Sequence, residues 1–562
     1  MKYANWNVPE HGAEIPRALL AAGCTPLLAA ILHLRGLSDP AAARSFLRGG
    51  AETLTNPLEL TGMVDAVQRL TRAVATGEHV AVYGDYDVDG ITAACLLTDY
   101  LRFRGLTCEL KIPDRIRDGY GLNTAAIDAL AEEGVTLIVT VDCGVTNLEE
   151  TAYAAQRGVD MIVTDHHECR EALPEAEAVV DPKQPDSSGV GTALAGVGVA
   201  FKLVCAMEGD ADKMLARYGD LVAVGTVADV MPLLGENRFI TRCGLQKIAA
   251  GDCRPGFLAL AEEAGVRDKP FTASTVGFSL APRINAAGRL GEPSLAVRLL
   301  EEADLRRARV LAAELCAKNR ERQALEMDIW REAVERLHGE QPDAPIVLAS
   351  EGWHPGVIGI VASRLTDAYS VPAVMICLDG ESGKGSCRST GSFNLFEALS
   401  ACSDCLEGFG GHAMAAGVTV RRGCVDELRS RLREYYLSHP DRTLPALEAD
   451  LLVDSPELLT MACVESLDEL EPCGNGNPRP LLYMENVSLD SVQPIGGGKH
   501  LRLKLAKFGQ TYDGVFFSQT APALGARAGQ RCDIVFAPQI NEFHGRRSVQ
   551  LVITDLRRSK EG

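Results

Sequence analysis

The chain has 562 residues, of which 76 are acidic and 56 basic, so its formal net charge is -20. This excludes a protein that coats nucleic acid through bulk positive charge, although a local basic channel or bound metal ions could still hold DNA. With 46% hydrophobic and 23% charged residues, the composition excludes extensive disorder. The length predicts roughly three or four domains.

The first residues carry no secretory signal, because Met1–Arg17 contains acidic residues and prolines before any apolar stretch. The uncharged stretch 18–34 is too short to span a membrane and is interrupted by Pro26. We therefore expect a cytoplasmic protein without membrane contact. Scattered cysteines predict buried, reduced thiols, and the single Cys-x-x-Cys, Cys402–Cys405, lacks the second pair that a structural zinc site needs.

In the first half of the chain, apolar strand-like runs end in polar tips and are followed by helical patterns. The run 79–83 meets the acidic segment 84–90, with helical spacing from Ile91 to Arg104. Two further runs, 137–141 and 161–164, end at Asp142 and at Asp165-His166-His167, and the segments 123–133 and 147–157 have helical patterns. This order predicts a parallel, doubly wound α/β sheet, whose sites lie at the carboxyl ends of the strands.

The second half changes character three times. Residues 294–337 contain no glycine or proline and are rich in Ala, Glu, Arg and Leu, which predicts one long connector helix. A smaller α/β region opens with a strand at 345–349, and short alternating segments within 446–557 predict a β-barrel. We divide the chain into an N-terminal helical segment (1–60), an α/β domain (61–293), the connector (294–338), a smaller α/β domain (339–440) and the barrel (446–558).

Acidic and histidine side chains gather at the predicted strand ends. They are Asp85, Asp87, Asp89, Asp142, Asp165, His166 and His167, joined by Asp229 after an apolar helical stretch. Like charges at one sheet edge repel, and divalent cations such as Mn²⁺ or Mg²⁺ remove that cost. A shared carboxylate would hold two ions about 3.5–4 Å apart, the arrangement used to hydrolyse phosphoesters. Alternatively, each acid alone could cap a helix and the histidine pair could be structural; three successive tips favour the metal site.

Candidate phosphate-binding groups lie further along the chain. Arg283, Arg388 and Ser389 suit phosphate oxygens, and the glycines at 410, 411 and 417 allow close approach of backbone N–H groups. Surface arginines, a turn serine and a turn histidine at His412 are the alternatives. The barrel combines aromatic and basic residues, which suits stacking on single strands, although most of its phenylalanines are expected in the core.

These motifs resemble the DHH phosphoesterase superfamily and, within it, the bacterial RecJ single-stranded-DNA exonucleases. The segment 83–92 resembles the first family motif, 141–144 the second, 164–168 the third and 225–229 the fourth. The resemblance implies that Asp87, Asp89, Asp142, His166 and Asp229 bind metal, with Asp142 bridging both ions. His167 is implied as a ligand or as facing the scissile phosphate, and Asp165 as a supporting group. Tyr83 stands where many relatives carry histidine, so Asp85 or a water would replace that ligand.

The resemblance continues through almost the whole chain. Residues 280–290, 351–361, 385–390 and 410–417 resemble motifs before and within the DHH-associated domain, and 472–480 resembles the start of an OB-fold-like barrel. The substrate-binding residues implied are Arg283, Asn285, Arg289, His354, Arg388, Ser389, Gly411 and His412.

The resemblance implies a 5′→3′ exonuclease that hydrolyses single-stranded DNA to 5′-mononucleotides with two Mn²⁺ or Mg²⁺ ions, in DNA recombination and repair. It implies a monomer whose partners are single-stranded-DNA-binding protein and a RecQ-type helicase. Two alternatives remain: a phosphodiesterase for oligonucleotides or cyclic dinucleotides, and a catalytically inactive DNA-binding scaffold. The predicted barrel disfavours the first and the complete acidic motifs disfavour the second.

Overall fold

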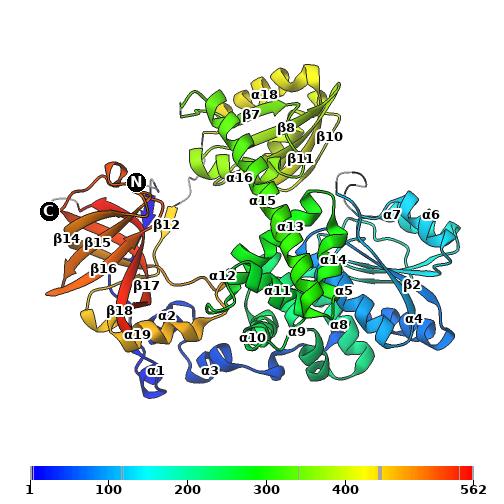
Figure 1. Ribbon diagram of the computed structural model, residues 1–562, viewed down its shortest axis with the longest axis horizontal. Coiled ribbons are helices and arrows are strands. Elements are labelled where there is room, and N and C mark those ends of the chain that lie inside the picture. Colours follow the sequence, from blue (N-terminus) through cyan, green and yellow to red (C-terminus); the bar gives the residue numbers. More distant parts are fainter. Residues whose placement is uncertain are drawn as a thin grey trace.

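The computed structural model describes residues 3, 5–115, 117, 119, 121–339, 341–440, 446–543 and 545–559. Figure 1 shows a large α/β domain beside a β-barrel, with a smaller α/β domain above them. The long helix α15 (Leu305–Arg336) leads from the large domain to the smaller one, and both chain termini lie at the barrel (Figure 1). Within the described residues, no helix has the length and apolar character needed to cross a membrane.

The large domain is built on five parallel strands in the order β3-β2-β4-β5-β6. Their bounds are β2 (His79–Gly84), β3 (Thr107–Lys111), β4 (Leu137–Val141), β5 (Asp160–Thr164) and β6 (Ala178–Val180). The central strand β4 is buried along its length because helices cover both faces of the sheet. Val82 packs in the core on one face, while Ala81 and Tyr83 pack against Ile127 and Leu130 on the other.

The helices of this domain follow the strands as the sequence predicts. Their bounds are α4 (Met63–Thr76), α5 (Val88–Phe103), α6 (Thr124–Glu132), α7 (Leu148–Gln156), α8 (Gly196–Glu208), α9 (Ala211–Ala228), α10 (Gly235–Ala250), α11 (Pro255–Glu263), α12 (Ala273–Thr275), the π-helical η3 (Val276–Leu280), α13 (Ala281–Arg289) and α14 (Pro293–Glu301). The predicted strands β2, β4 and β5 and the helices α5, α6 and α7 are confirmed. The outer strands β3 and β6 were not predicted.

The predicted long connector helix is confirmed as α15, but the expectation that it runs without interruption from residue 294 is wrong. The chain forms two helices, α14 and α15, separated by Glu302–Asp304. Glu302 is extended, and the Asp304 carboxylate accepts a hydrogen bond from the Arg307 N–H (2.9 Å), which caps the start of α15. A local cap therefore starts a new helix inside a segment that lacks any glycine or proline.

The smaller α/β domain contains a mixed sheet in the order β10-β11-β9-β8-β7. Its elements are β7 (Ile346–Ser350), α16 (Ile358–Tyr369), β8 (Ala373–Asp379), β9 (Ser382–Arg388), α17 (Leu395–Ser400), η4 (Ser403–Cys405), β10 (Gly408–Gly411), β11 (Ala415–Arg421), η5 (Arg422–Cys424) and α18 (Val425–Ser438). Two of its glycines serve packing, since a Cβ at Gly383 or Gly385 would lie 2.7 Å from Ile376 or 2.6 Å from Val418. All 17 cysteines are free thiols, with Cys402 and Cys405 buried.

The barrel is closed by pairing between β14 and β17, in the order β13-β14-β15-β16-β18-β17. Its elements are β12 (Ala446–Glu448), β13 (Leu451–Leu452), η6 (Pro456–Leu459), α19 (Met461–Ser466), η7 (Leu467–Leu470), β14 (Leu482–Ile495), β15 (His500–Lys507), β16 (Gln510–Phe516), η8 (Pro522–Leu524), β17 (Arg531–Phe543) and β18 (Arg546–Arg558). Tyr512, Phe516 and Phe536 lie in its core, whereas Phe517 and Phe543 are exposed.

The N-terminal segment packs on the barrel. It comprises β1 (Asn5–Asn7), α1 (Arg17–Ala21), α2 (Pro26–Leu34), α3 (Pro40–Arg48), η1 (Ala51–Thr53) and η2 (Pro57–Glu59). Strand β1 pairs with β12, and buried residues of α2 share one hydrophobic core with barrel strands. The division of the chain into five segments, drawn from the sequence, stays a prediction.

Candidate metal centre

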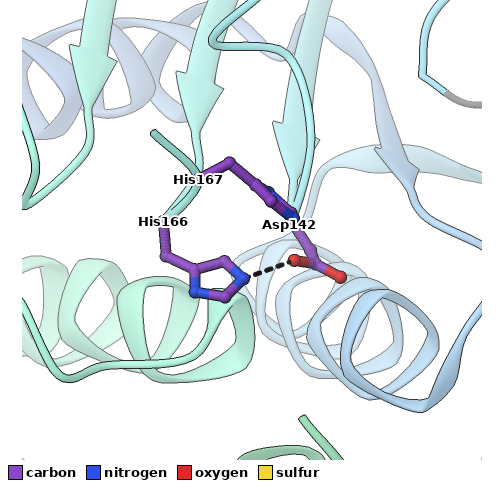
Figure 2. A group of neighbouring side chains, drawn as sticks. All are labelled: Asp142, His166 and His167. Carbon is purple, nitrogen blue, oxygen red and sulfur yellow. Dashed lines mark ion pairs between the residues drawn. The ribbon is translucent and has the colours of Figure 1, made fainter. Parts of the chain in front are cut away.

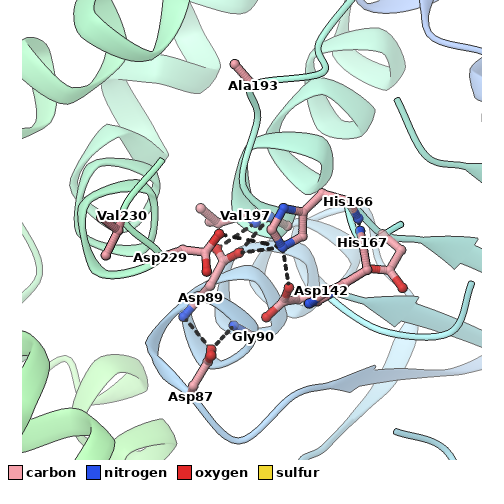
Figure 3. A network of polar contacts seen from close by, with 12 residues as sticks. Asp87, Asp89, Gly90, Asp142, His166, His167, Ala193, Val197, Asp229 and Val230 are labelled. Atoms are coloured by element: carbon pink, nitrogen blue, oxygen red, sulfur yellow. Dashed lines mark hydrogen bonds and ion pairs between the residues drawn. The ribbon is translucent and has the colours of Figure 1, made fainter. Parts of the chain in front are cut away.

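The carboxyl ends of β2, β4 and β5 bring the predicted acidic and histidine residues together. Asp85 follows β2, Asp142 follows β4, and Asp165 and His166 follow β5. Figure 3 shows Asp87 and Asp89 at the start of α5 and Asp229 at the end of α9, with Asp229 pointing toward His166. Segments that lie far apart in the chain thus converge on one sheet edge.

The loop after β2 is shaped by a helix cap. The Asp87 carboxylate accepts hydrogen bonds from the N–H groups of Asp89 (2.9 Å) and Gly90 (3.1 Å) at the first turn of α5 (Figure 3). A Cβ at Gly90 would lie 2.5 Å from the backbone of Asp85, so only glycine allows the loop to fold back so closely. Asp87 can therefore cap α5 and also offer a carboxylate oxygen to a metal ion.

Asp142 and Asp89 are held by the start of α8. Asp142 has a φ of 60°. A Cβ at Gly196 would lie 2.5 Å from the Cβ of Asp142, so the glycine lets the start of α8 approach Asp142. The Asp89 carboxylate accepts hydrogen bonds from Gly196 N–H (2.6 Å) and Val197 N–H (2.9 Å). The amides at a helix N-terminus thus hold one buried carboxylate in place.

His166 lies at the centre of the acidic groups. Its Nε2 atom is 3.0 Å from Asp142 Oδ1 (Figure 2), 3.6 Å from Asp229 Oδ2 and 3.8 Å from Asp89 Oδ2. Three carboxylate oxygens around one imidazole nitrogen form an arrangement that a shared cation would satisfy.

Asp165 supports the centre from behind. Its carboxylate bonds His167 Nδ1 (2.7 Å) and accepts hydrogen bonds from Val145 N–H (3.0 Å) and His166 N–H (2.8 Å). Because its oxygens already have these partners, Asp165 orients the His167 ring through Nδ1.

Burial and like charge dominate the electrostatics. Burial first, and Asp87 second, raise the pKa of Asp85 to about 8. The same two causes raise the pKa of Asp229 to about 7. Burial also raises the pKa of Asp89 and Asp142, with neighbouring aspartates adding to the effect. These groups are costly to ionise together unless a positive charge joins them.

The histidines shift in opposite directions. Burial first, and His167 second, lower the pKa of His166 to about 4, which keeps its ring neutral and able to bind a metal. Burial lowers the pKa of His167 as well, but the hydrogen bond to Asp165 outweighs it and brings that pKa to about 9.

The donor set fits divalent cations. Asp85 Oδ1, Asp142 Oδ1 and both ring nitrogens of His166 are buried and have no hydrogen bond of acceptable geometry among the described residues. Ligand atoms lie within 4.8 Å of one another in three groups: Asp142, His166 and His167; Asp89, His166 and Asp229; and Asp85, Asp87 and Asp142. Carboxylate oxygens with imidazole nitrogens suit Mn²⁺ and Mg²⁺.

Tyr83 lies away from this edge. Its ring is fully buried on the other face of β2, and its hydroxyl donates to the Gly121 carbonyl (3.1 Å). Asp85, by contrast, belongs to a group with Asp87 and Asp142. This placement favours Asp85 over Tyr83 as a candidate metal ligand.

A cluster of arginines faces the acidic groups. Burial, and then Arg115, Arg322 and Arg388, lower the pKa of Arg289 to about 10. Arg289 Nη1 donates to the Gly356 carbonyl (3.2 Å) and Arg388 Nη1 to the Cys387 carbonyl (2.8 Å). Among the described residues, Arg115, Arg289 and Arg388 have no carboxylate within ion-pair distance. Adjacent cations without acidic partners form a site for an anion.

Arg115 was missed by sequence reasoning. It lies in the segment after β3, at the same sheet edge as the metal groups, and its guanidinium lies 5.0 Å from the centre of the Tyr86 ring. The rule that located the other groups, a polar tip after a strand, would have located Arg115 had β3 been recognised.

The other residues predicted to bind substrate differ from one another in their contacts. The Arg283 guanidinium contacts the Ser279 carbonyl (2.5 Å) and Cys316 Sγ (3.3 Å). Asn285 Oδ1 accepts a hydrogen bond from Val88 N–H (3.2 Å), within the metal loop.

The remaining predicted residues belong to the smaller domain. The Ser389 hydroxyl donates to the Phe393 carbonyl (2.7 Å), and His354 Nδ1 accepts from Gly356 N–H (3.1 Å). Gly411 ends β10 and His412 follows it, and both residues are exposed. Arg388 and His354 therefore lie near Arg289, where the two α/β domains meet. The hydroxyl proton of Ser389 is already donated to the Phe393 carbonyl.

Comparisons with known proteins cover all three modules. A model described as the DHH family N-terminal domain matches residues 79–226, the DHHA1 domain matches 323–437 and the RecJ OB domain matches 450–555. The single-stranded-DNA-specific exonuclease RecJ of Bacillus subtilis is 40% identical over 542 residues, covering 94% of this chain and 68% of that protein. RecJ of Escherichia coli is 34% identical over 567 residues, 96% of each.

Solved structures agree with these matches. The crystal structure of RecJ in complex with Mn²⁺ from Thermus thermophilus has a TM-score of 0.85 at 31% identity, over 99% of this chain and 80% of that one. The corresponding Mg²⁺ complex has a TM-score of 0.80 at 30% identity. With relatives of 34–40% identity along nearly its full length, the chain belongs to the RecJ family of DHH phosphoesterases.

Proposed function

We propose that the chain is a metal-dependent exonuclease that hydrolyses single-stranded DNA in the 5′→3′ direction and releases 5′-mononucleotides. The observation that carries the proposal is the placement of an anion-binding arginine cluster beside a buried group of carboxylates and imidazoles. Its relatives named single-stranded-DNA-specific exonucleases support the substrate class.

Asp85, Asp87, Asp89, Asp142, His166 and Asp229 would hold two Mn²⁺ or Mg²⁺ ions, because their ligand atoms fall into groups that are close enough to share a cation. Bound divalent ions supply a water nucleophile at neutral pH and stabilise charge on the phosphate. Asp165 bonds His167 Nδ1, and the pKa of His167 is raised to about 9, so its ring is protonated at neutral pH and would donate a hydrogen bond from Nε2 to a phosphate oxygen. The neutral ring of His166 and the backbone amides on Asp89 keep the remaining groups in position.

Arg115, Arg289 and Arg388 would bind the 5′ end. A terminal phosphate carries more negative charge than an internal one, and three guanidinium groups without acidic partners favour it. A strand anchored by its 5′ phosphate presents its first phosphodiester at a fixed distance from the metal groups, which yields mononucleotides from the 5′ end.

The barrel would hold the strand behind its 5′ end. Phe517 and Phe543 are exposed on it, and Arg546 and Arg547 follow Phe543 at the start of β18. Aromatic faces with cations bind single strands independently of sequence. We place the protein in DNA recombination and repair, in the cytoplasm, as a monomer that works with single-stranded-DNA-binding protein and a RecQ-type helicase.

The test uses single-stranded DNA labelled at either end and incubated with Mn²⁺, comparing the wild type with Asp142→Ala. We expect rapid release of the 5′ label as a mononucleotide from the wild type and none from the variant. Release of the 3′ label alone would refute the polarity. DNA that is bound but unchanged would favour the scaffold alternative, and cleavage restricted to chains of a few nucleotides would favour the small-substrate phosphodiesterase.

A further inference from the structure

A short turn of the barrel module touches the backbone that follows Asp229. The turn is Gly474–Asn477, in which the N–H groups and carbonyls of Gly474 and Asn477 bond each other (2.9 and 3.1 Å). It lies far beyond Asp229 in the chain, yet its Asn475 contacts residues only one and four positions after that aspartate. The C-terminal module thus contacts the chain directly after a residue of the metal centre.

The backbone at this place is strained. Val230 directly follows Asp229 and has a φ of 58°, a left-handed conformation that is rare for a β-branched residue. Such a conformation is unfavourable and persists only where surrounding contacts enforce it. Val230 is 64% exposed, so packing of its side chain does not enforce the conformation. The N–H groups of Val230 and Met231 bond the carbonyls of Val227 and Thr226 (3.2 Å each) at the end of α9, and the contacts of Asn475 add to these two bonds. Figure 3 shows Val230 at the end of α9, next to Asp229.

Asn475 contacts the strained residue itself and the segment that follows it. Its side-chain Nδ2 donates to the Val230 carbonyl (2.8 Å), and its own carbonyl accepts from Leu233 N–H (2.8 Å). Glycines let the turn come close: a Cβ at Gly474 would lie 2.7 Å from Leu233, and one at Gly476 would lie 3.1 Å from Leu234. The turn therefore clamps the segment 230–233.

The turn itself is rigidly mounted. The fully buried Asn477 side chain donates to the carbonyls of Leu470 and Pro472 (2.8 Å each). Arg238, on α10 of the catalytic domain, is 3% exposed and donates to five backbone carbonyls, those of Phe46, Glu469, Leu470, Glu471 and Pro472. The lead-in to the barrel is thus fixed to the catalytic domain before Asn475 makes its contacts.

We propose that Asn475 is a positioning residue for the reaction: it holds the strained turn after Asp229 and thereby sets this carboxylate for the metal. The barrel module then contributes to the catalytic centre itself, in addition to holding DNA. The inference rests on the proposed function in one respect, the assignment of Asp229 as a metal ligand. Asn475 is exposed, so removing its amide leaves no cavity.

The experiment measures Mn²⁺ binding to the full-length protein by the loss of the free Mn²⁺ signal in electron paramagnetic resonance, together with KM for DNA and kcat at several Mn²⁺ concentrations. Loss of one hydrogen bond predicts Mn²⁺ affinity about two- to tenfold lower in Asn475→Ala. We expect kcat to fall at low Mn²⁺ and to recover at high Mn²⁺, with KM for DNA unchanged. The matched control is Asn7→Ala, which removes an exposed amide contact to Glu448 on the barrel side.

A second substitution tests the strain directly. Glycine adopts positive φ without cost, so Val230→Gly should restore Mn²⁺ affinity in the Asn475→Ala background. Unchanged Mn²⁺ affinity in Asn475→Ala, or a raised KM for DNA as its only effect, would overturn the inference and leave the proposed function standing. Failure of Val230→Gly to restore affinity would also overturn it. A wild type that binds no Mn²⁺ would overturn the proposed function, and the inference with it.

Discussion

Replacing Asp85 with asparagine should stabilise the metal-free protein and weaken its response to Mn²⁺. Asp85 is 5% exposed, and burial followed by Asp87 raises its pKa from 3.8 to about 8. Because the pKa is higher in the folded state, the stability linked to this group is fully present below about pH 4. It is lost progressively as the pH rises through about 8. Asparagine does not titrate and escapes this loss.

The size of the effect follows from the linkage of protons to folding. Each pH unit over which the folded protein holds one extra proton changes stability by about 1.4 kcal/mol, which gives an upper limit of about 5 kcal/mol at pH 8. Asp87 and Asp142 share the repulsion and water enters the metal-free site, so we expect about 1–3 kcal/mol. For a domain of this size, that corresponds to a rise in Tm of about 2–10 °C.

Thermal unfolding in EDTA at pH 5, 6.5 and 8, followed by circular dichroism, measures this difference. The gap between Asp85→Asn and the wild type should widen as the pH rises. Mn²⁺ at about 100 times its Kd should stabilise the wild type by about 2.7 kcal/mol for each ion bound, and the variant by less. Asp252→Asn, which alters a carboxylate with 80% of its side chain exposed, is the control. A variant no more stable than the wild type at pH 8, or a gap independent of pH, would refute the reasoning.

Substitutions at two further residues, Asn285 and Arg388, test the groups around the metal site. Asn285→Ala should weaken Mn²⁺ binding because it removes the acceptor for Val88 N–H. Asn285→Asp keeps that acceptor and should retain most of the Mn²⁺ affinity. A large rise in KM for DNA in Asn285→Asp alone would instead indicate that Asn285 contacts a phosphate. Arg388→Ala should raise KM by about tenfold or more for DNA with a 5′ phosphate and much less for DNA with a 5′ hydroxyl, since one charge-assisted hydrogen bond is lost; equal effects on both substrates, measured by initial rates, would contradict a role at the 5′ end.

The sequence by itself determined much of the local secondary structure of this protein and the residues at its strand ends. Apolar runs and helical patterns located β2, β4, β5 and the helices after them, because burial on both faces of a parallel sheet requires continuous apolar runs. Polar residues at the strand ends identified the metal-site candidates, and the structure places them within reach of one another. Short patterns failed where a local cap decided the outcome, as at Asp304, whose cap divides the expected connector helix.

Only the tertiary structure decided which distant segments meet. The arginine cluster joins Arg115 after β3 with Arg289 on α13 and Arg388 on β9, and no pattern within any of these segments indicates the others. The same holds for Asn475, whose contact with Val230 depends on two glycines and on the burial of Arg238 between modules. Secondary structure and caps are set by neighbours a few residues away, whereas such contacts arise from close packing of whole domains, which a linear pattern does not encode.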